Sequence, residues 1–125
     1  MTDEDIQEMF EAFNRHDTDA VMTFFHDDIV FETASGPESY GTRFEGKQAV
    51  RKQFENTWGS MPDVQWLGGN HYRAVDVIAT EATFVATQAD GKRIHVDQVD
   101  LLTIKDGKIV RKQAFRKNRP LLDPV

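Results

Sequence analysis

The chain contains no cysteine, which excludes disulfides, thiolate metal sites and a cysteine nucleophile. It also has no run of 18 apolar residues, so the sequence predicts no segment that spans a membrane. The first five residues lack the basic start and the apolar stretch of a secretory signal peptide. From these absences we expect a cytoplasmic protein with no membrane partner.

Basic residues are fewer than acidic ones, 15 against 21, and the net charge of −6 argues against a nucleic-acid partner. The two signs are unevenly distributed. Residues 1–45 hold 12 acidic and two basic side chains, whereas residues 105–119 hold seven basic and one acidic. The basic segment has two interpretations: lysines on a solvated strand that discourage edge-to-edge pairing, or a site for an anionic ligand near Lys112 or Arg116.

The length and composition suit one globular domain with one core, because 39% of the 125 residues are hydrophobic and 29% are charged. We expect a single domain over residues 1–125. Its core should span about 3–117, and a loose tail at 118–125 contains two prolines.

Three helices are predicted in the first half of the chain. A capping box at residues 2–5 precedes apolar residues at helical spacing, which predicts a helix over about 3–15. A second, short helix follows Asp17 and ends at residues 26–28. A third runs from Gly46 to about Gly59, because its apolar residues again share one face.

The rest of the chain has the alternation and the turn residues of strands. A loop is expected at 34–46 and a bulge at Gly68-Gly69. Strands are expected at 29–33, 64–67, 71–77, 79–89, 92–104 and 108–117. Helices gathered against an antiparallel sheet indicate an α+β fold. A long twisted sheet that curls around three helices leaves a conical cavity suited to a small ligand.

The strand at 92–104 lies between two Asp-Gly pairs and is predicted to be the middle of a three-stranded meander. Alternate residues point to opposite faces of a strand, so Asp100 shares a face with Val96, Gln98 and Leu102. A carboxylate on such an apolar face costs free energy unless it is paired, hydrogen-bonded or protonated. Asp100 is therefore the first candidate for a functional residue.

The two turns predict what Asp100 faces. A two-residue loop at Asp90-Gly91 places Asp100 opposite Glu81. A bulged turn at Asp106-Gly107, which we prefer, places it opposite Lys112, and a two-residue turn places it opposite Gln113. In a Glu81–Asp100–Lys112 row, the carboxylates would raise each other's proton affinity and the lysine would oppose this. A partly solvated ion cluster is the alternative interpretation.

Further residues are candidates to line the cavity. The expected lining comprises Met9, Phe13, Phe31, Thr33, Phe54, Trp58, Trp66, Val85, Gln98, Lys112 and Arg116. Gln98 is either a group that orients a carbonyl or a satisfied core amide. Trp66 either stacks on a ring or fills the core.

Histidine is scarce, and its four positions lack the spacing of metal ligands, so we expect no metal and no cofactor. His71 follows the Gly-Gly bulge and is a candidate for proton transfer. The outer sheet face, with Phe84, Val99 and Leu101, is the candidate surface for a homodimer.

Six short motifs follow one another along the chain in the order found in a known superfamily. They are Asp17-x-Asp19-Ala20, Phe25-x-Asp27-Asp28, Phe31-Glu32, Gly46-x-x-Ala49-Val50, Val96-Asp97-x-Val99-Asp100 and Asp106-Gly107-Lys108-Ile109. Over residues 3 to about 117 this order resembles the NTF2-like superfamily, and within it the SnoaL-like and ketosteroid-isomerase-like branch. The resemblance implies an α+β cone: a strongly curved, mixed but mostly antiparallel sheet wrapped around three helices, with an internal pocket and usually a homodimer through the outer face.

The resemblance also assigns roles to single positions. Asp100 matches the protonated aspartate that acts as an oxyanion donor in ketosteroid isomerases. Glu32 matches a glutamate on the first strand, but Thr33 stands where those enzymes have their general base. A one-residue shift of this alignment would place Glu32 at the base position. Met9, Phe25 and Phe54 occupy positions of the isomerase tyrosines.

Without that base and those hydroxyl groups, steroid isomerisation by the same mechanism is not expected. One hypothesis is a cofactor-independent enzyme of the SnoaL-like type, in which Asp100 transfers a proton next to the carbonyl of a hydrophobic compound. A second is a module that binds a hydrophobic ligand without chemistry. A third is a dimeric scaffold whose pocket is filled by side chains.

Overall fold

The computed structural model describes all 125 residues. Its elements are α1 (Asp3–Asn14), α2 (Thr18–Met22), β1 (Phe25–Glu32), β2 (Arg43–Glu45), α3 (Lys47–Ser60), β3 (Gln65–Leu67), β4 (His71–Arg73), β5 (Val77–Thr87), β6 (Arg93–Lys105) and β7 (Lys108–Arg116). The sheet has seven strands in the order β2-β1-β7-β6-β5-β3, with β4 also paired to β5. All pairs are antiparallel except β1 with β7. The predicted α+β class with a mixed, mostly antiparallel sheet is confirmed.

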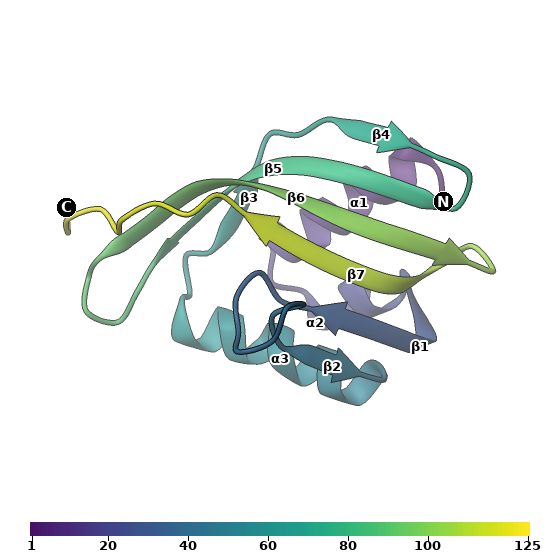
Figure 1. The fold of residues 1–125 in the computed structure, drawn as a ribbon, viewed down its shortest axis with the longest axis horizontal. Coiled ribbons are helices and arrows are strands. Elements are labelled where there is room, and N and C mark those ends of the chain that lie inside the picture. Colours follow the sequence, from purple (N-terminus) through teal and green to yellow (C-terminus); the bar gives the residue numbers. More distant parts are fainter.

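The helices cover one face of the sheet. Figure 1 shows α1 behind the long strands β5 and β6, and α3 beside β1 and β2. The predicted capping box is present, since Thr2 Oγ1 accepts from Asp5 N and Asp5 Oδ2 accepts from Thr2 N. No helix is long and apolar enough to cross a lipid bilayer.

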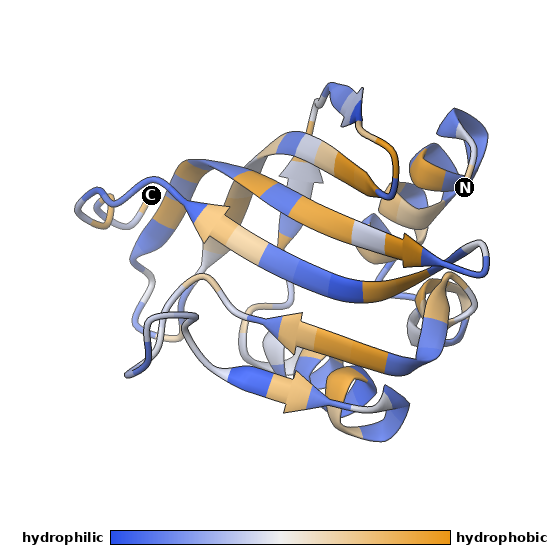
Figure 2. Ribbon diagram, turned by 45° about the vertical axis from the view of Figure 1, so that its right-hand side comes forward, coloured by the Kyte–Doolittle hydropathy of each residue, from blue (hydrophilic) through white to orange (hydrophobic).

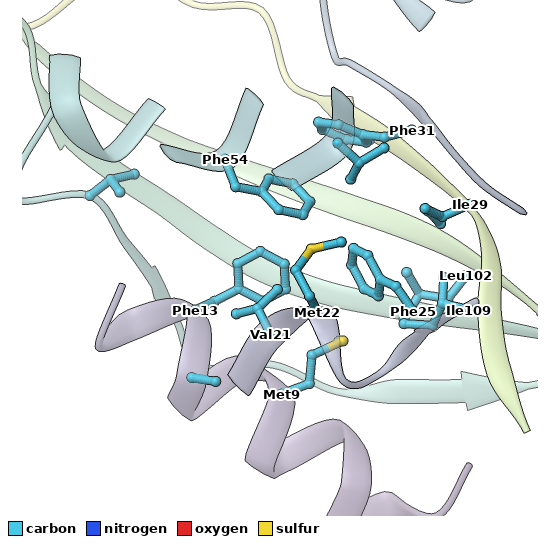
Figure 3. Close-up of a cluster of buried hydrophobic side chains, with 14 of the residues drawn as sticks. Met9, Phe13, Val21, Met22, Phe25, Ile29, Phe31, Phe54, Leu102 and Ile109 are labelled. Carbon is cyan, nitrogen blue, oxygen red and sulfur yellow. The ribbon is translucent and has the colours of Figure 1, made fainter. Parts of the chain in front are cut away.

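Twenty buried hydrophobic side chains form the core between the helices and the sheet. Figure 3 shows Met9 and Phe13 of α1 and Phe54 of α3 directed towards Phe25 and Phe31 of β1. Along the sheet strands, hydrophobic and hydrophilic bands alternate (Figure 2), as expected for strands with one buried face.

Two predictions about the first strand region are wrong. Residues 34–46 are not wholly a loop, because β2 lies within them and pairs with β1 through Phe31 and Phe44. Residues 26–28 do not end a helix. They belong to β1, which begins at Phe25 because that residue already pairs with Ile109 of β7.

The predicted bulge at Gly68-Gly69 is confirmed, and it decides which way His71 points. Leu67 lies opposite Thr83, whereas His71 lies opposite Thr80, so three residues on one side face two on the other. Gly69 has φ 136°, and a Cβ there would lie 2.4 Å from the Glu81 carbonyl oxygen. Only glycine tolerates this conformation and this close approach.

The β5–β6 register differs by one residue from the prediction. The turn holds three residues between Gln88 and Lys92, and the Gln88 N–H donates to the Lys92 carbonyl at 2.8 Å. Asp100 therefore faces Thr80 and not Glu81. Because a one-residue shift turns every side chain to the opposite face, the predicted orientations of the whole β5 strand are wrong.

The β6–β7 turn also differs from the preferred prediction. Asp106 and Gly107 form a two-residue turn with φ values of 54° and 74°, typical of the type I′ turn. The irregularity lies one step further, between the pairs Thr103–Arg111 and Ile104–Ile109. Asp100 therefore lies opposite Ala114, so both predicted partners, Lys112 and Gln113, are wrong as direct cross-strand neighbours.

On the outer face, Glu32 joins three strands. Its side chain is 3% exposed, and it accepts from Arg43 of β2 at 2.7 Å and from Arg111 of β7 at 2.7 Å. Burial raises the pKa of Glu32, but the hydrogen bonds and charges of Arg111 and Arg43 outweigh burial and hold the pKa below its ordinary value. This carboxylate therefore stabilises the junction of β2, β1 and β7 in its ionised form.

Replacement of Glu32 by Gln should lower the free energy of unfolding by about 1–3 kcal/mol in urea titrations at neutral pH. This expected loss is moderate because both arginines are more than a third exposed, so water can solvate their guanidinium groups when the carboxylate is removed. Since the folded pKa is depressed, the stabilisation is present above the unfolded value of roughly 4.3 and is lost as pH falls through the folded value.

Below neutral pH, the free energy of unfolding of the Glu32→Gln variant should therefore fall less steeply with decreasing pH than that of the wild type. Glu45→Gln, an exposed exchange on β2, is the control. Equal losses in both variants would contradict the proposed role of Glu32.

Candidate functional site

A cavity of about 260 Å³ lies between α3, β1 and the inner face of the sheet, and it is partly open to solvent. The residues that line it are Phe31, Thr33, Ala34, Ser35, Thr42, Phe44, Gln53, Phe54, Thr57, Trp58, Met61, Trp66, Phe84, Gln98, Lys112, Ala114 and Arg116. Six of these are aromatic. Since a cavity of roughly 150 Å³ holds benzene, this one has room for a molecule of one or two rings.

Most of the predicted lining residues surround this cavity, but three do not. Met9 and Phe13 reach only a deep void of about 10 Å³ that also contacts Asp100. Val85 lies opposite His95 on the outer face and is excluded by the register shift. Phe84, predicted on the outer face, is fully buried and lines the cavity.

At the inner end of the cavity, Asp100 and Lys112 form a buried ion pair. Asp100 is 2% exposed and Lys112 is 5% exposed, and Nζ lies 3.3 Å from Oδ2. Although Lys112 lies opposite Leu102, its side chain reaches Asp100 diagonally on the same face. Lys112 contacts both the cavity and the deep void, whereas Asp100 contacts only the void. The lysine therefore stands between the carboxylate and the space for a ligand.

Aromatic rings surround the lysine. Its Nζ lies 5.0 Å from the centre of the Phe31 ring and 5.6 Å from that of Phe13. Both distances are within the range of a cation–π interaction. Ring faces and one carboxylate thus replace the water that an exposed ammonium would have.

A hydrogen-bonded chain links the ion pair to Arg116, which also lines the cavity. Gln98 Nε2 donates to Asp100 Oδ2 at 3.1 Å, and Arg116 Nε donates to Gln98 Oε1 at 2.8 Å. This geometry fixes the Gln98 amide, whose carbonyl and amino groups are both engaged by protein. Of the two predicted roles for Gln98, the structure therefore favours the satisfied amide.

The Arg116 guanidinium lies 3.7 Å from the centre of the Phe84 ring, although the residue as a whole is exposed. Desolvation lowers the pKa of Arg116, and the charge of Asp100 offsets this in part. The residue remains a cation at neutral pH. It supplies a second positive group to the same cavity.

Thr33, which stands where ketosteroid isomerases have their general base, lines the cavity. Its Oγ1 donates to the Ser35 carbonyl at 2.8 Å and accepts from the Thr42 N–H at 3.0 Å. Glu32 points to the outer face, where both arginines hold it. The alternative alignment with Glu32 as the base is therefore wrong.

His71, Thr80 and Asp100 lie in a row across three strands on the inner face. The His71 ring stacks on Phe10 with a centroid separation of 6.0 Å. His71 Nδ1, Thr80 Oγ1 and Asp100 Oδ1 are buried and have no protein hydrogen-bond partner. His71 does not line the cavity, so it is separated from a ligand there.

Glu81 is exposed and lies opposite Val99. It lines a wider outer groove of about 620 Å³ together with Asp97, Phe115 and Lys117. The prediction that Glu81 lies beside Asp100 is therefore wrong, whereas the predicted contact between Asp100 and Lys112 is confirmed. The structure contains no group of three or more His, Asp or Glu that could hold a metal ion.

Sequence reasoning missed Phe44 and Phe84 as cavity residues. A signal for Phe84 exists in β5 itself, where Ala82, Phe84 and Ala86 share one face and Glu81, Thr83 and Thr87 share the other. This pattern would have placed Glu81 on the outer face without any assumption about the turn.

The ion pair generates a stability prediction. Asp100→Asn or Lys112→Met alone leaves a buried charge without its partner and should each lower the free energy of unfolding by about 3–5 kcal/mol. The double variant removes both charges, so its cost should be lower than the sum by at least about 1 kcal/mol. Urea unfolding of the four proteins gives this coupling.

The matched control is the cycle of Asp97→Asn and Lys117→Met, which changes the same charges on exposed outer positions. Each control change should stay within about 0.5 kcal/mol and be additive. Additive costs at Asp100 and Lys112 would contradict the buried pair.

Comparisons with known proteins agree with this architecture. The solved structures that are similar to the chain include three at 18–20% identity. One is a protein with a ketosteroid isomerase-like fold from Catenulispora acidiphila, in complex with trimethylamine (19% identity, TM-score 0.79, 92% of this chain and 86% of that one). Another is a candidate polyketide cyclase from Xanthomonas campestris pv. campestris (20%, 0.79, 91% and 88%). The third is TerC co-crystallised with polyporic acid (18%, 0.76, 91% and 89%).

At this level of identity the solved structures support the fold alone. No curated protein matches the sequence. The model of the SnoaL-like domain matches residues 6–112, which include most of α1, most of the sheet and the Asp100–Lys112 pair. This chain therefore belongs to the SnoaL-like family of the NTF2-like superfamily.

Proposed function

We propose that the protein binds a hydrophobic carbonyl compound of one or two rings in the aromatic cavity and transfers a proton next to that carbonyl without a cofactor. The buried Asp100–Lys112 pair at the end of this cavity carries the proposal. Family membership supports a small-molecule pocket. Two of the similar solved structures contain small organic molecules: one protein is in complex with trimethylamine, and TerC is co-crystallised with polyporic acid.

The two members of the pair have different tasks. Lys112 lines the cavity and can donate a hydrogen bond to a carbonyl oxygen, which stabilises the negative charge that develops there when a neighbouring C–H is deprotonated. Asp100 keeps the ammonium in place and leaves Oδ1 free of protein partners, so it can accept a proton. The base that ketosteroid isomerases have on the first strand is replaced by Thr33, which supports a different reaction from steroid isomerisation.

The small void beside Asp100 limits how closely a ligand can approach this carboxylate for proton transfer. Met9 and Phe13 line this void together with Asp100, and its volume is only about 10 Å³. Proton transfer to Asp100 therefore requires that one edge of the ring enters this void past Lys112. A methionine side chain is flexible enough to make room by changing rotamer.

Binding without chemistry is the second candidate. Its support is that no aspartate, glutamate or histidine lines the main cavity. The third hypothesis, a scaffold with a filled pocket, has the least support because the cavity is open. A homodimer through the outer sheet face remains a proposal, to which the exposed Phe115 and Tyr72 side chains lend support.

Hydrogen–deuterium exchange on 2-tetralone tests the proposal. In D₂O, the wild-type protein should accelerate deuterium incorporation at the carbons next to the carbonyl, measured by proton NMR. Asp100→Asn should lower this acceleration about 100-fold, since a positioned acid–base group contributes at least that factor. Asp97→Asn, on the same strand but exposed on the outer face, should not change it.

Circular dichroism would first establish that the Asp100 variant is folded. Saturable binding of 2-tetralone with no acceleration over buffer would contradict proton transfer and favour the non-catalytic module. Absence of binding would contradict the proposal as a whole.

A further inference from the structure

The cavity is positively charged, although the chain as a whole has a net charge of −6. Its charged lining residues are Lys112 and Arg116, and no carboxylate lines it. Asp100 pairs with Lys112 but does not itself line the cavity. Two cations against this one carboxylate leave a net positive charge at the cavity.

Hydrogen-bond donors without a protein partner are also available at the cavity, which favours a ligand that supplies acceptors. Arg116 has five N–H donors and uses Nε on Gln98, so the terminal nitrogens keep donors for a ligand. Lys112 has three donors, and its one charged partner is Asp100. Trp58, 7% exposed, has a buried indole N–H without an acceptor. An indole N–H can only donate.

Hydrogen-bond acceptors are scarcer than donors near Lys112 and Arg116. Asp100 Oδ2 and Gln98 Oε1 are both engaged within the protein, and Asp100, whose Oδ1 has no partner, contacts the small void and does not line the cavity. The other polar lining residues, among them Thr33 and Gln53, are neutral. A ligand that complements this surface therefore supplies acceptor oxygens and negative charge, together with flat faces for the aromatic walls.

We propose that the physiological ligand is a flat ring compound with an acidic oxygen, namely a carboxylate, phenolate or enolate, bound by the terminal nitrogens of Arg116 and by Lys112. This inference rests on the proposed function, because it concerns the same cavity. Arg116 is suited to the role, since its planar guanidinium already stacks on Phe84 and can present two parallel donors to two oxygens. Desolvation lowers the pKa of this residue, and a bound anion would compensate that cost.

Three matched probes test the charge preference: 2-naphthoate, 2-naphthamide and 2-naphthylmethylammonium. They share one ring system and differ in the charge of the substituent. The chain has two tryptophans, and both line the cavity. Intrinsic fluorescence therefore reports on binding at this site, and isothermal titration gives the dissociation constants.

The naphthoate should bind about 10- to 100-fold more tightly than the naphthamide, the factor expected for hydrogen bonds to a charged group. The ammonium compound should bind most weakly. Arg116→Met should reduce naphthoate affinity by about tenfold or more and reduce naphthamide affinity little. Arg116→Lys should restore only part of the loss, because a lysine lacks the planar pair of donors.

Lys117→Met is the control, since it removes the same charge from the neighbouring residue, which lies outside the cavity. Equal affinity for naphthoate and naphthamide would overturn the inference and leave the proposed function standing. So would a naphthoate preference that survives in Arg116→Met or is lost equally in Lys117→Met. Failure of all three probes to bind would instead count against the proposed function itself.

Discussion

The site depends on one buried ion pair between neighbouring strands. A carboxylate and an ammonium inside an apolar cone are tolerated because each satisfies the other and because further groups support them. Gln98 holds Asp100 at 3.1 Å, and aromatic rings surround Lys112. The pair costs more desolvation than an apolar pair of equal volume would, so its presence is better explained by chemistry or ligand binding than by stability. Its orientation places the cation towards the ligand and the anion behind it.

The sequence was sufficient for the fold class, the three helices, the central meander and the burial of Asp100, because periodicity and turn residues carry that information locally. It was not sufficient for the partners of Asp100. The length of the turn at Asp90-Gly91 differs from the assumption by one residue, and this single difference reverses the faces of Glu81, Phe84 and Val85. Turn conformation depends on backbone angles that the dipeptide alone does not determine.

The prediction at the second hairpin shows a different limit. Lys112 was expected to contact Asp100 as its direct neighbour, yet the contact arises diagonally, since Asp100 lies opposite Ala114. A long side chain reaches more than one neighbour on the same face, so the contact tolerates an error in register. Short side chains, such as that of Thr80, have no such tolerance. Side-chain length therefore decides which predictions from strand pairing are robust.

The central claim is that the inner end of the cavity accepts the negatively charged part of a flat ligand. A crystal structure of the complex with 2-naphthoate tests it most directly, because it locates the two oxygens. We expect the rings to lie between Phe54 and the sheet, with the carboxylate oxygens within hydrogen-bond distance of Arg116 and Lys112. Rings inserted towards Lys112 with the carboxylate directed to solvent, or a ligand bound in the outer groove, would contradict it.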